Sequence, residues 1–317
     1  MGAYSSTLVS LALLPGLCAE AKIPVILDTD IGGDIDDTWA LAFLLASPEV
    51  DLQLVVTDSH NTVGKAKIVA KFLERVGRPD IPVGIGLQID DEIGPQAPWA
   101  ADYDLARYPG RVYEDGVNAL IEHLLKAPEK ITLLSIGPVP NLRLALEREP
   151  RIVEKARLVA MAGGVYKQYG GQPGRCAEYN VKADIPAAQQ VFSAPWDITL
   201  APLDTAGVVC LTGEPYRRVR DAHNPLTEAL LENYRLWSQD PQRPQEASSI
   251  LFDTVAAYLT FRTDWIALRD LPLQVNDQGE TIPAEDGKII HTAVEWTDLE
   301  AFQEFLANRL CQGVAAQ

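Results

Sequence analysis

Cysteine and histidine are scarce, and neither is spaced as a structural metal site requires. The 317-residue chain contains four cysteines and four histidines, without a Cys-x-x-Cys pair or a zinc-type histidine spacing. The sequence therefore predicts neither a zinc centre built on histidine nor a disulfide scaffold, and we expect the cysteines to be ordinary thiols.

Positive charge is also in short supply. The chain carries 27 Lys and Arg against 44 Asp and Glu, which gives a formal net charge of −17. Because so acidic a protein repels phosphate backbones, we expect no nucleic-acid partner. Its surplus carboxylates are instead the natural ligands of a hard cation such as calcium or magnesium.

No apolar stretch is long enough to cross a membrane as a helix, so we expect no membrane insertion. The short run Leu8–Leu14 precedes small residues that end at Ala21, which is typical of a signal peptide, although no Lys or Arg precedes the run. We interpret residues 1–21 as a signal peptide or a disordered extension of a folded domain at 22–317. The protein is periplasmic or secreted under the first interpretation and cytoplasmic under the second.

Short apolar segments alternate with helical patterns from Ile23 onward. Continuously apolar runs such as Ile23–Leu27 and Leu52–Val56 are typical of buried parallel strands, and Asp37–Ala46 between them has apolar residues at helical spacing. The same pattern predicts further strands at Ile81–Ile85, Ile131–Ile136, Leu158–Met161 and Ile198–Ala201. Repeated strand–helix units predict an α/β fold with a mostly parallel, open, Rossmann-like central sheet flanked by helices.

Two other regions do not follow this alternation of strands and helices. After Thr212 helical patterns dominate, so we predict a helix-rich C-terminal part with one β-type patch at Lys288–Val294 and a final helix at Leu299–Leu310. The segment Asp90–Gly110 is loop-like and long enough to form a lid over a functional site.

Five aspartates lie within Asp28–Asp37, directly after the first predicted strand and at the start of the first predicted helix. In an open α/β sheet, ligands bind outside the carboxyl ends of the strands, where this loop must lie. Packing so many like charges is destabilising unless a cation or hydrogen-bond donors compensate them. Gly32 and Gly33 let the backbone bend so that the carboxylates converge. The segment therefore predicts a divalent-cation site.

Three other interpretations of these aspartates explain them less well. An EF-hand loop that starts at Asp28 needs a Glu where Trp39 stands. An Asp-x-Asp phosphatase would use Asp28 as the nucleophile and Asp30 as the acid, but Gly32 stands where such enzymes normally have Thr or Val. A solvated turn that caps a helix explains one or two aspartates but not five.

The segment Asp28–Leu41 resembles the N-terminal signature of the inosine-uridine preferring nucleoside hydrolase family. Other segments are similar to further motifs of that family, in the expected order: Asn61, Ile136–Leu142, Met161–Gly164, Ala177–Asn180 with Asp184, and Phe252-Asp253. The resemblance runs from Ile23 through Leu259 and makes residues 22–317 a nucleoside hydrolase-like catalytic domain.

The resemblance implies Ca²⁺-dependent hydrolysis of the N-glycosidic bond of ribonucleosides to ribose and free base. It implies that Asp30 is the general base and that Asp36 contacts the ribose 2′-hydroxyl and assists catalysis. Asn61, Glu178 and Asn180 would hold ribose hydroxyls, and a homodimer or homotetramer is implied. The implied Ca²⁺ ligands are Asp30, Asp37, Asp253 and the main-chain carbonyl of Ile136.

Phe252 departs from the family pattern. In purine-accepting members a histidine stands at this place and protonates the leaving base, whereas Phe252 can only stack on a ring. Another group then supplies the proton, or the base leaves without it, so base specificity stays open. The change also leaves room for a nucleoside- or ribose-binding protein without catalysis. The aromatic candidates for contact with the base are Trp99, Tyr103, Tyr108, Tyr234 and Trp237, although packing in the hydrophobic core is the more common use of any one of them.

Overall fold

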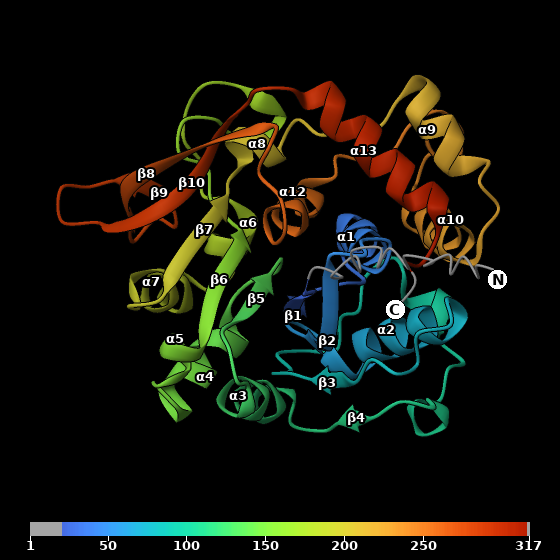
Figure 1. The fold of residues 1–317 in the computed structure, drawn as a ribbon, viewed down its shortest axis with the longest axis horizontal. Helices are drawn as coiled ribbons and strands as arrows, with labels where there is room; N and C mark the ends of the chain where they lie inside the picture. Colours follow the sequence, from blue (N-terminus) through green and yellow to red (C-terminus); the bar gives the residue numbers. More distant parts are fainter. Residues whose placement is uncertain (1–20, 316–317) are drawn as a thin grey trace, which may run out of the picture.

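A ten-stranded, mostly parallel sheet forms the centre of the protein, with helices on both faces (Figure 1). The computed structural model describes residues 21–315. The strands are β1 (Ile23–Thr29), β2 (Val50–Thr57), β3 (Val83–Ile85), β4 (Val112–Tyr113), β5 (Ile131–Ser135), β6 (Ala156–Met161), β7 (Asp197–Ala201), β8 (Ile266–Val275), β9 (Thr281–Pro283) and β10 (Lys288–Trp296). The predicted α/β architecture is confirmed.

Helices connect most of the strands and cover the sheet. The α-helices of the described residues are α1 (Asp36–Leu45), α2 (Thr62–Arg75), α3 (Gly116–Lys126), α4 (Pro140–Arg148), α5 (Ile152–Lys155), α6 (Tyr179–Lys182), α7 (Ile185–Ser193), α8 (Leu203–Ala206), α9 (Gly213–Arg220), α10 (Pro225–Trp237), α11 (Arg243–Glu246), α12 (Phe252–Leu259) and α13 (Leu299–Gln312). No helix within residues 21–315 is long and apolar enough to cross a membrane. Residues 1–20 of the predicted signal peptide or extension lie outside the described part of the chain.

The direction in which the sheet grows reverses at β1. The strand order is β4-β3-β2-β1-β5-β6-β7-β10-β8-β9, so later strands are added first on one side of β1 and then on the other. β1 pairs in parallel with both β2 and β5. At such a switch point the loops after two neighbouring strands diverge and leave a crevice at the carboxyl edge of the sheet. The loop that joins β1 to α1 lies at this crevice.

The two faces of the sheet pack into separate hydrophobic cores. Because successive side chains of a strand point to opposite faces, Val25 and Leu27 of β1 belong to one core and Ile26 belongs to the other. The first core includes residues of α1, α2, α10, α12 and α13, and the second includes residues of α3, α4 and α7. All residues of α1 are buried, including Asp36 and Asp37 in its first turn.

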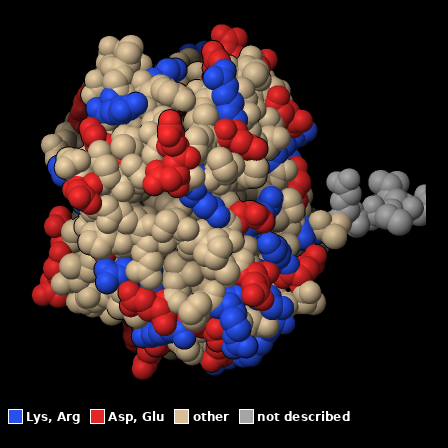
Figure 2. All heavy atoms as spheres, turned by 90° about the vertical axis from the view of Figure 1, so that its left-hand side faces the viewer, with Lys and Arg blue, Asp and Glu red and all other residues tan. Residues whose placement is uncertain are grey.

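The C-terminal part is helix-rich, as predicted, but it also contains two strands that the sequence analysis missed. β10 extends the parallel sheet from β7 and pairs antiparallel with β8, which in turn pairs antiparallel with β9. The alternation of apolar residues in β8 is interrupted by Arg269, Asp270 and Pro272. The segment therefore does not match the sequence pattern of a strand. The three strands project from the left of Figure 1, and on that side Lys and Arg are interspersed with Asp and Glu (Figure 2).

A substitution of Phe43, in α1, tests how much the first core contributes to stability. It is fully buried and makes edge-to-face contacts with the rings of Phe261, Phe302 and Phe305. Phe43→Ala removes these contacts and leaves a cavity, so it should lower the free energy of unfolding by about 3–5 kcal/mol in urea denaturation. The control Leu236→Ala, at an exposed position, should change it by no more than about 0.5 kcal/mol. Equal losses in the two variants would contradict the core assignment.

Candidate active site

A cavity of about 300 Å³ lies at the carboxyl edge of the sheet, beside the switch point at β1. This volume is at the lower end of the range, roughly 300–1,000 Å³, that is usual for small-molecule sites. The predicted site residues that line it are Asp30, Asp36, Asp37, Ile136, Glu178, Asn180, Phe252 and Asp253. A larger hollow of about 520 Å³ lies at the opposite edge, beside Pro24 and Ile131, and contains none of the predicted site residues.

Three buried carboxylates meet in this cavity. One carboxylate oxygen from each of Asp36, Asp37 and Asp253 lies within 4.8 Å of the other two. Asp36 and Asp37 begin α1, and Asp253 lies in the first turn of α12. The N-terminal ends of two packed helices therefore meet at the carboxylates, and the positive ends of their dipoles favour negative charge there.

The three carboxyl groups do not ionise readily by themselves. Burial is the main cause that raises the pKa of Asp36, Asp37 and Asp253 well above the usual range, and the neighbouring aspartates raise it further. A cation supplies the positive charge that such a group lacks. Because every donor is an oxygen, the site suits a hard cation better than a transition metal. These residues fit the cation that the resemblance implies.

Asp30 lies beside this group of three rather than within it. Burial raises the pKa of Asp30, and the charge of Lys65 partly offsets that effect. Lys65 is itself buried, and its Nζ donates to the main-chain oxygens of Asp30 at 2.8 Å and Asp58 at 3.2 Å. Asp36, which we predicted to contact the sugar, thus joins the carboxylate group in which Asp30 was expected.

Glu178 and Asn180, in the segment after β6, form another wall of the cavity. Asn180 Nδ2 donates to the carbonyl oxygens of Ile136 at 3.2 Å and Met161 at 3.0 Å. The Glu178 carboxylate accepts hydrogen bonds from the main-chain N–H groups of Gly163 and Asn180, each at 2.9 Å. Burial outweighs these bonds and raises the pKa of Glu178 to about 7. The loop is therefore held in place by the same side chains that face the cavity.

Asn61 is the predicted site residue that the structure does not bring into the cavity lining. Its Oδ1 accepts a hydrogen bond from the main-chain N–H of Gly64 at 2.8 Å and thereby caps α2. Its Nδ2 donates to the carbonyl oxygen of Asp91. Capping is a common use of asparagine immediately before a helix, and here it engages both ends of the amide.

The predicted lid meets the cavity only through its first residues, Glu92–Pro95. Gln96, which follows them, accepts a hydrogen bond from Thr38 Oγ1 at 2.8 Å and donates to the carbonyl of Asp34 at 2.9 Å. Gly32 and Gly94 have φ values of 105° and 104°, and a Cβ on Gly94 would lie 2.2 Å from the oxygen of Gly32. Glycine at these positions lets the aspartate loop and the predicted lid approach each other closely.

The five aromatic candidates for contact with the base pack elsewhere, in the use that we considered more common for each of them. Trp99, Tyr108 and Tyr234 are buried in the first core, and Trp237 packs against Tyr234 with ring centroids 5.8 Å apart. The hydroxyl of Tyr103 donates to Glu74. None of the five lines the cavity.

Four residues that line the cavity were not predicted from the sequence: His60, Lys65, Tyr169 and Tyr179. His60 directly precedes Asn61 in the loop after β2. The carboxyl end of β2 lies at the same edge of the sheet as that of β1, so His60 could have been expected near the aspartate loop. Tyr179 lies between two residues that were singled out, Glu178 and Asn180. Tyr169 lies in a short 3-10 helix, Tyr169–Gly171, that no local pattern marks.

The model of the inosine-uridine preferring nucleoside hydrolase family matches residues 25–304. The chain belongs to this family. The non-specific ribonucleoside hydrolase RihC of Escherichia fergusonii is 28% identical over 312 residues, which cover 92% of this chain and 99% of that protein. The RihC protein of Escherichia coli strain SMS-3-5 is 27% identical, with 91% and 98% covered.

Solved nucleoside hydrolases share the fold of this family member. The plant nucleoside hydrolase PpNRh1 superposes with a TM-score of 0.77 at 23% identity, covering 92% of this chain and 99% of the plant chain. An inosine-uridine preferring nucleoside hydrolase from Bacillus anthracis gives a TM-score of 0.72 at 22% identity, with 93% and 100% covered.

As a nucleoside hydrolase, this protein is an enzyme that cleaves N-glycosidic bonds, and the two alternatives are less consistent with the structure. A phosphatase nucleophile must reach its substrate, but Asp28 is fully buried and does not line the cavity. Its carboxylate accepts a hydrogen bond from Asn141 Nδ2 at 2.8 Å, and burial raises its pKa to about 7. Family membership likewise favours an enzyme over a protein that only binds nucleosides.

The raised pKa of Asp253 predicts a dependence of stability on pH. Because the folded protein holds this proton to a higher pH than the unfolded chain does, stability falls as the pH rises above the unfolded pKa of about 4. Asp253→Asn removes the charge. Without divalent cations, the variant should be more stable than the wild type at pH 8, and the gain should shrink at pH 5.

Thermal unfolding in a chelating buffer measures this difference. Asp286→Asn is the control, because Asp286 is exposed in the turn between β9 and β10, and it should leave the melting temperature unchanged at both pH values. A lower melting temperature for Asp253→Asn at pH 8 would show that the carboxylate does not destabilise the cation-free protein.

Proposed function

We propose that this protein hydrolyses the N-glycosidic bond of ribonucleosides to ribose and free base in a Ca²⁺-dependent reaction. The observation that carries the proposal is the buried group of Asp36, Asp37 and Asp253 in a cavity that also contains aromatic side chains. Carboxylates suit a cation and the hydroxyls of a sugar, and aromatic rings suit a planar base. The similarity to proteins named non-specific ribonucleoside hydrolases supports a tolerance for different bases.

Asp30, Asp37, Asp253 and the main-chain carbonyl of Ile136 are the ligands that we propose for one Ca²⁺. An oxygen-only set of this kind, completed by water and ribose hydroxyls, suits the flexible coordination of Ca²⁺ better than the strict octahedron of Mg²⁺. When bound, the ion lowers the pKa of a water molecule and orients the sugar. Asp36 approaches Asp37 and Asp253 closely, so its role must be separated from that of Asp30 by experiment.

Asp30 and Asp36 have the catalytic roles in this proposal. Asp30 accepts the proton of the attacking water, and the nearby charge of Lys65 favours the ionised form that a base requires. Asp36 accepts a hydrogen bond from the ribose 2′-hydroxyl, which stabilises the positive charge that develops on the sugar as the bond to the base breaks.

The remaining cavity residues bind the substrate. We assign the 5′-hydroxyl to Glu178, another ribose hydroxyl to Asn180, and stacking on the base to Phe252. All three side chains line the cavity. We also assign a ribose hydroxyl to Asn61, whose amide in this structure caps α2 and donates to Asp91.

Two substitutions separate the proposed roles of the aspartates. Asp30→Asn and Asp36→Asn should each lower kcat at least about 100-fold, because each removes a charge that acts in the transition state. Release of reducing sugar from inosine, uridine, cytidine and adenosine measures turnover, and calorimetry measures Ca²⁺ affinity. Asp30→Asn should weaken Ca²⁺ binding more than Asp36→Asn does, because Asp30 is a proposed ligand whereas Asp36 is a neighbouring charge. Near-wild-type turnover in Asp30→Asn would refute its assignment as the base.

Chelation tests the need for the cation. Removal of divalent cations should abolish sugar release, and added Ca²⁺ should restore it more completely than the same concentration of Mg²⁺. Activity that survives thorough chelation would contradict the proposed Ca²⁺ dependence.

We also propose that the protein is a homodimer or homotetramer, which the family resemblance supports. Light scattering of the purified protein measures its mass in solution. A clean monomer mass would refute this assembly.

A further inference from the structure

The cavity has a buried floor and a more exposed mouth. The carboxylates of Asp36, Asp37 and Asp253 are buried, whereas His60 and Phe252 are half-buried and Tyr169 and Tyr179 are exposed. All of them line the same cavity. A ribonucleoside whose sugar lies on the carboxylates therefore extends its base toward the mouth, which these four side chains share with Glu92 and Pro95.

Phe252 and Tyr169 form the apolar part of this mouth. Their ring centroids lie 6.0 Å apart in an edge-to-face arrangement. The Tyr169 hydroxyl accepts a hydrogen bond from the main-chain N–H of Tyr179 at 3.0 Å. These contacts suit packing against a planar base, but neither ring carries a group that gives up a proton near neutral pH.

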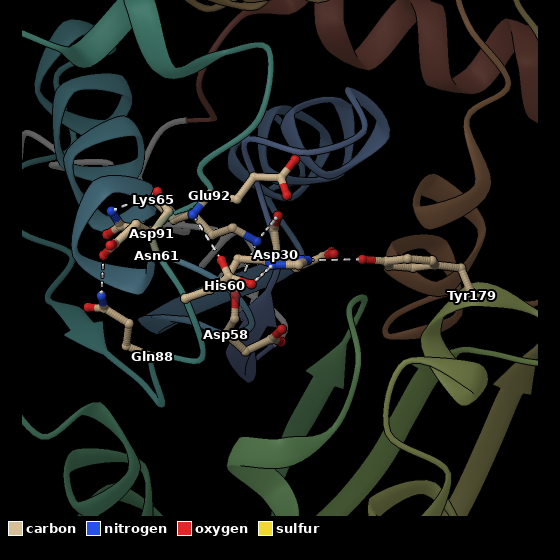
Figure 3. Close-up of polar contacts among 10 residues, drawn as sticks. Asp30, Asp58, His60, Asn61, Lys65, Gln88, Asp91, Glu92 and Tyr179 are labelled. Atoms are coloured by element: carbon tan, nitrogen blue, oxygen red, sulfur yellow. Dashed lines mark hydrogen bonds and ion pairs between the residues drawn. The ribbon is translucent and has the colours of Figure 1, made fainter.

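His60, at the mouth, has a hydrogen-bond partner at each of its two ring nitrogens. Its Nδ1 lies 2.8 Å from a carboxylate oxygen of Asp90, and its Nε2 lies 3.3 Å from the hydroxyl of Tyr179. Figure 3 shows that Tyr179 reaches His60 from the side opposite the loop after β2. A carboxylate on Nδ1 fixes the tautomer of the ring, so Nε2, on the side of Tyr179, is the nitrogen that can pass a proton to a substrate.

The backbone at His60 has an unusual conformation. Ser59 and His60 have φ values of 56° and 57°, in the left-handed region that residues other than glycine rarely adopt. The neighbouring segment holds this conformation, because Ile89 N–H donates to the His60 carbonyl at 3.0 Å and Asn61 N–H donates to the Glu92 carbonyl at 2.9 Å. Strained conformations of this kind persist where they aim a functional side chain.

We propose that His60 is the general acid that protonates the leaving base, with Asp90 holding its Nδ1 and Tyr179 orienting its ring. The inference deepens the proposed ribonucleoside hydrolysis and rests on it. His60 would supply the proton that Phe252 cannot supply.

The proposed step balances in protons and electrons. The bond between C1′ of the ribose and the base nitrogen breaks, and its electron pair stays on the base. Nε2 of His60 gives its proton to a ring nitrogen of the base, so the base leaves neutral. The oxygen of water forms the new bond to C1′, and the proton of that water goes to Asp30. Solvent then returns one proton from Asp30 to His60, which leaves ribose and free base as the products.

Leaving-group dependence tests the inference. A purine leaves well only when a ring nitrogen is protonated, whereas 4-nitrophenolate leaves without an acid. In His60→Gln, kcat/KM for inosine should fall at least about 100-fold, while kcat/KM for 4-nitrophenyl riboside stays close to that of the wild type. Tyr179→Phe should cause a smaller loss that is also confined to inosine.

His291→Gln is the matched control. His291 also pairs through Nδ1 with an aspartate, Asp270, but this pair joins β10 to β8 and does not line the cavity. The variant should hydrolyse both substrates at the wild-type rate.

The outcomes separate this inference from the function on which it rests. Unchanged inosine hydrolysis in a folded His60→Gln, or equal losses on the two substrates, overturns the role of His60. Should circular dichroism show that His60→Gln does not fold, Asp90→Asn decides: a selective loss on inosine supports the inference, and no loss overturns it. A wild-type protein that cleaves neither riboside overturns the proposed function itself.

Discussion

Repulsion among buried carboxylates is the interaction on which the rest of the site depends. Asp36, Asp37 and Asp253 are buried close together, and each one raises the free energy of the others when ionised. The chain offers little compensation, because the buried Lys65 donates to main-chain carbonyls rather than to these carboxylates. Two helix N-termini favour the charge but do not neutralise it. The arrangement is costly without a cation and well suited to one.

The fold keeps this arrangement in place by anchoring each carboxylate to a rigid element. The aspartates lie at the start of α1 and α12, two helices that pack against each other, and not at the tip of a free loop. The aspartate loop is further tied to the segment after β3 through Gln96. The mouth is different, since only Phe252 lies on α12, whereas His60 comes from the loop after β2 and the exposed Tyr169 and Tyr179 come from the region after β6. The buried floor therefore suits the sugar and the chemistry, and the mouth suits the base.

Local patterns in the sequence were sufficient for the floor of the site but not for its mouth. The apolar run at Ile23–Leu27 predicted β1, and the aspartates beside it then had to lie at the carboxyl edge of the sheet. The sequence did not reveal that Asn61 caps α2 or that Trp99 and Tyr234 fill the core, because an asparagine or an aromatic ring serves either purpose equally well. The grouping of His60, Asp90 and Tyr179 depends on contacts between residues far apart in the chain. β8 was missed for a simpler reason, since its proline and charged residues obscure the alternation of a strand.

The central claim is that the carboxylates hold protons until a cation replaces them. Calorimetric titration of Ca²⁺ into the metal-free protein at pH 7, in two buffers of different ionisation enthalpy, counts both the ions bound and the protons released. We predict one Ca²⁺ per chain and a release of protons on binding, because burial raises the pKa values of the proposed carboxylate ligands Asp30, Asp37 and Asp253. Failure to bind Ca²⁺, or binding without any release of protons, would contradict the account.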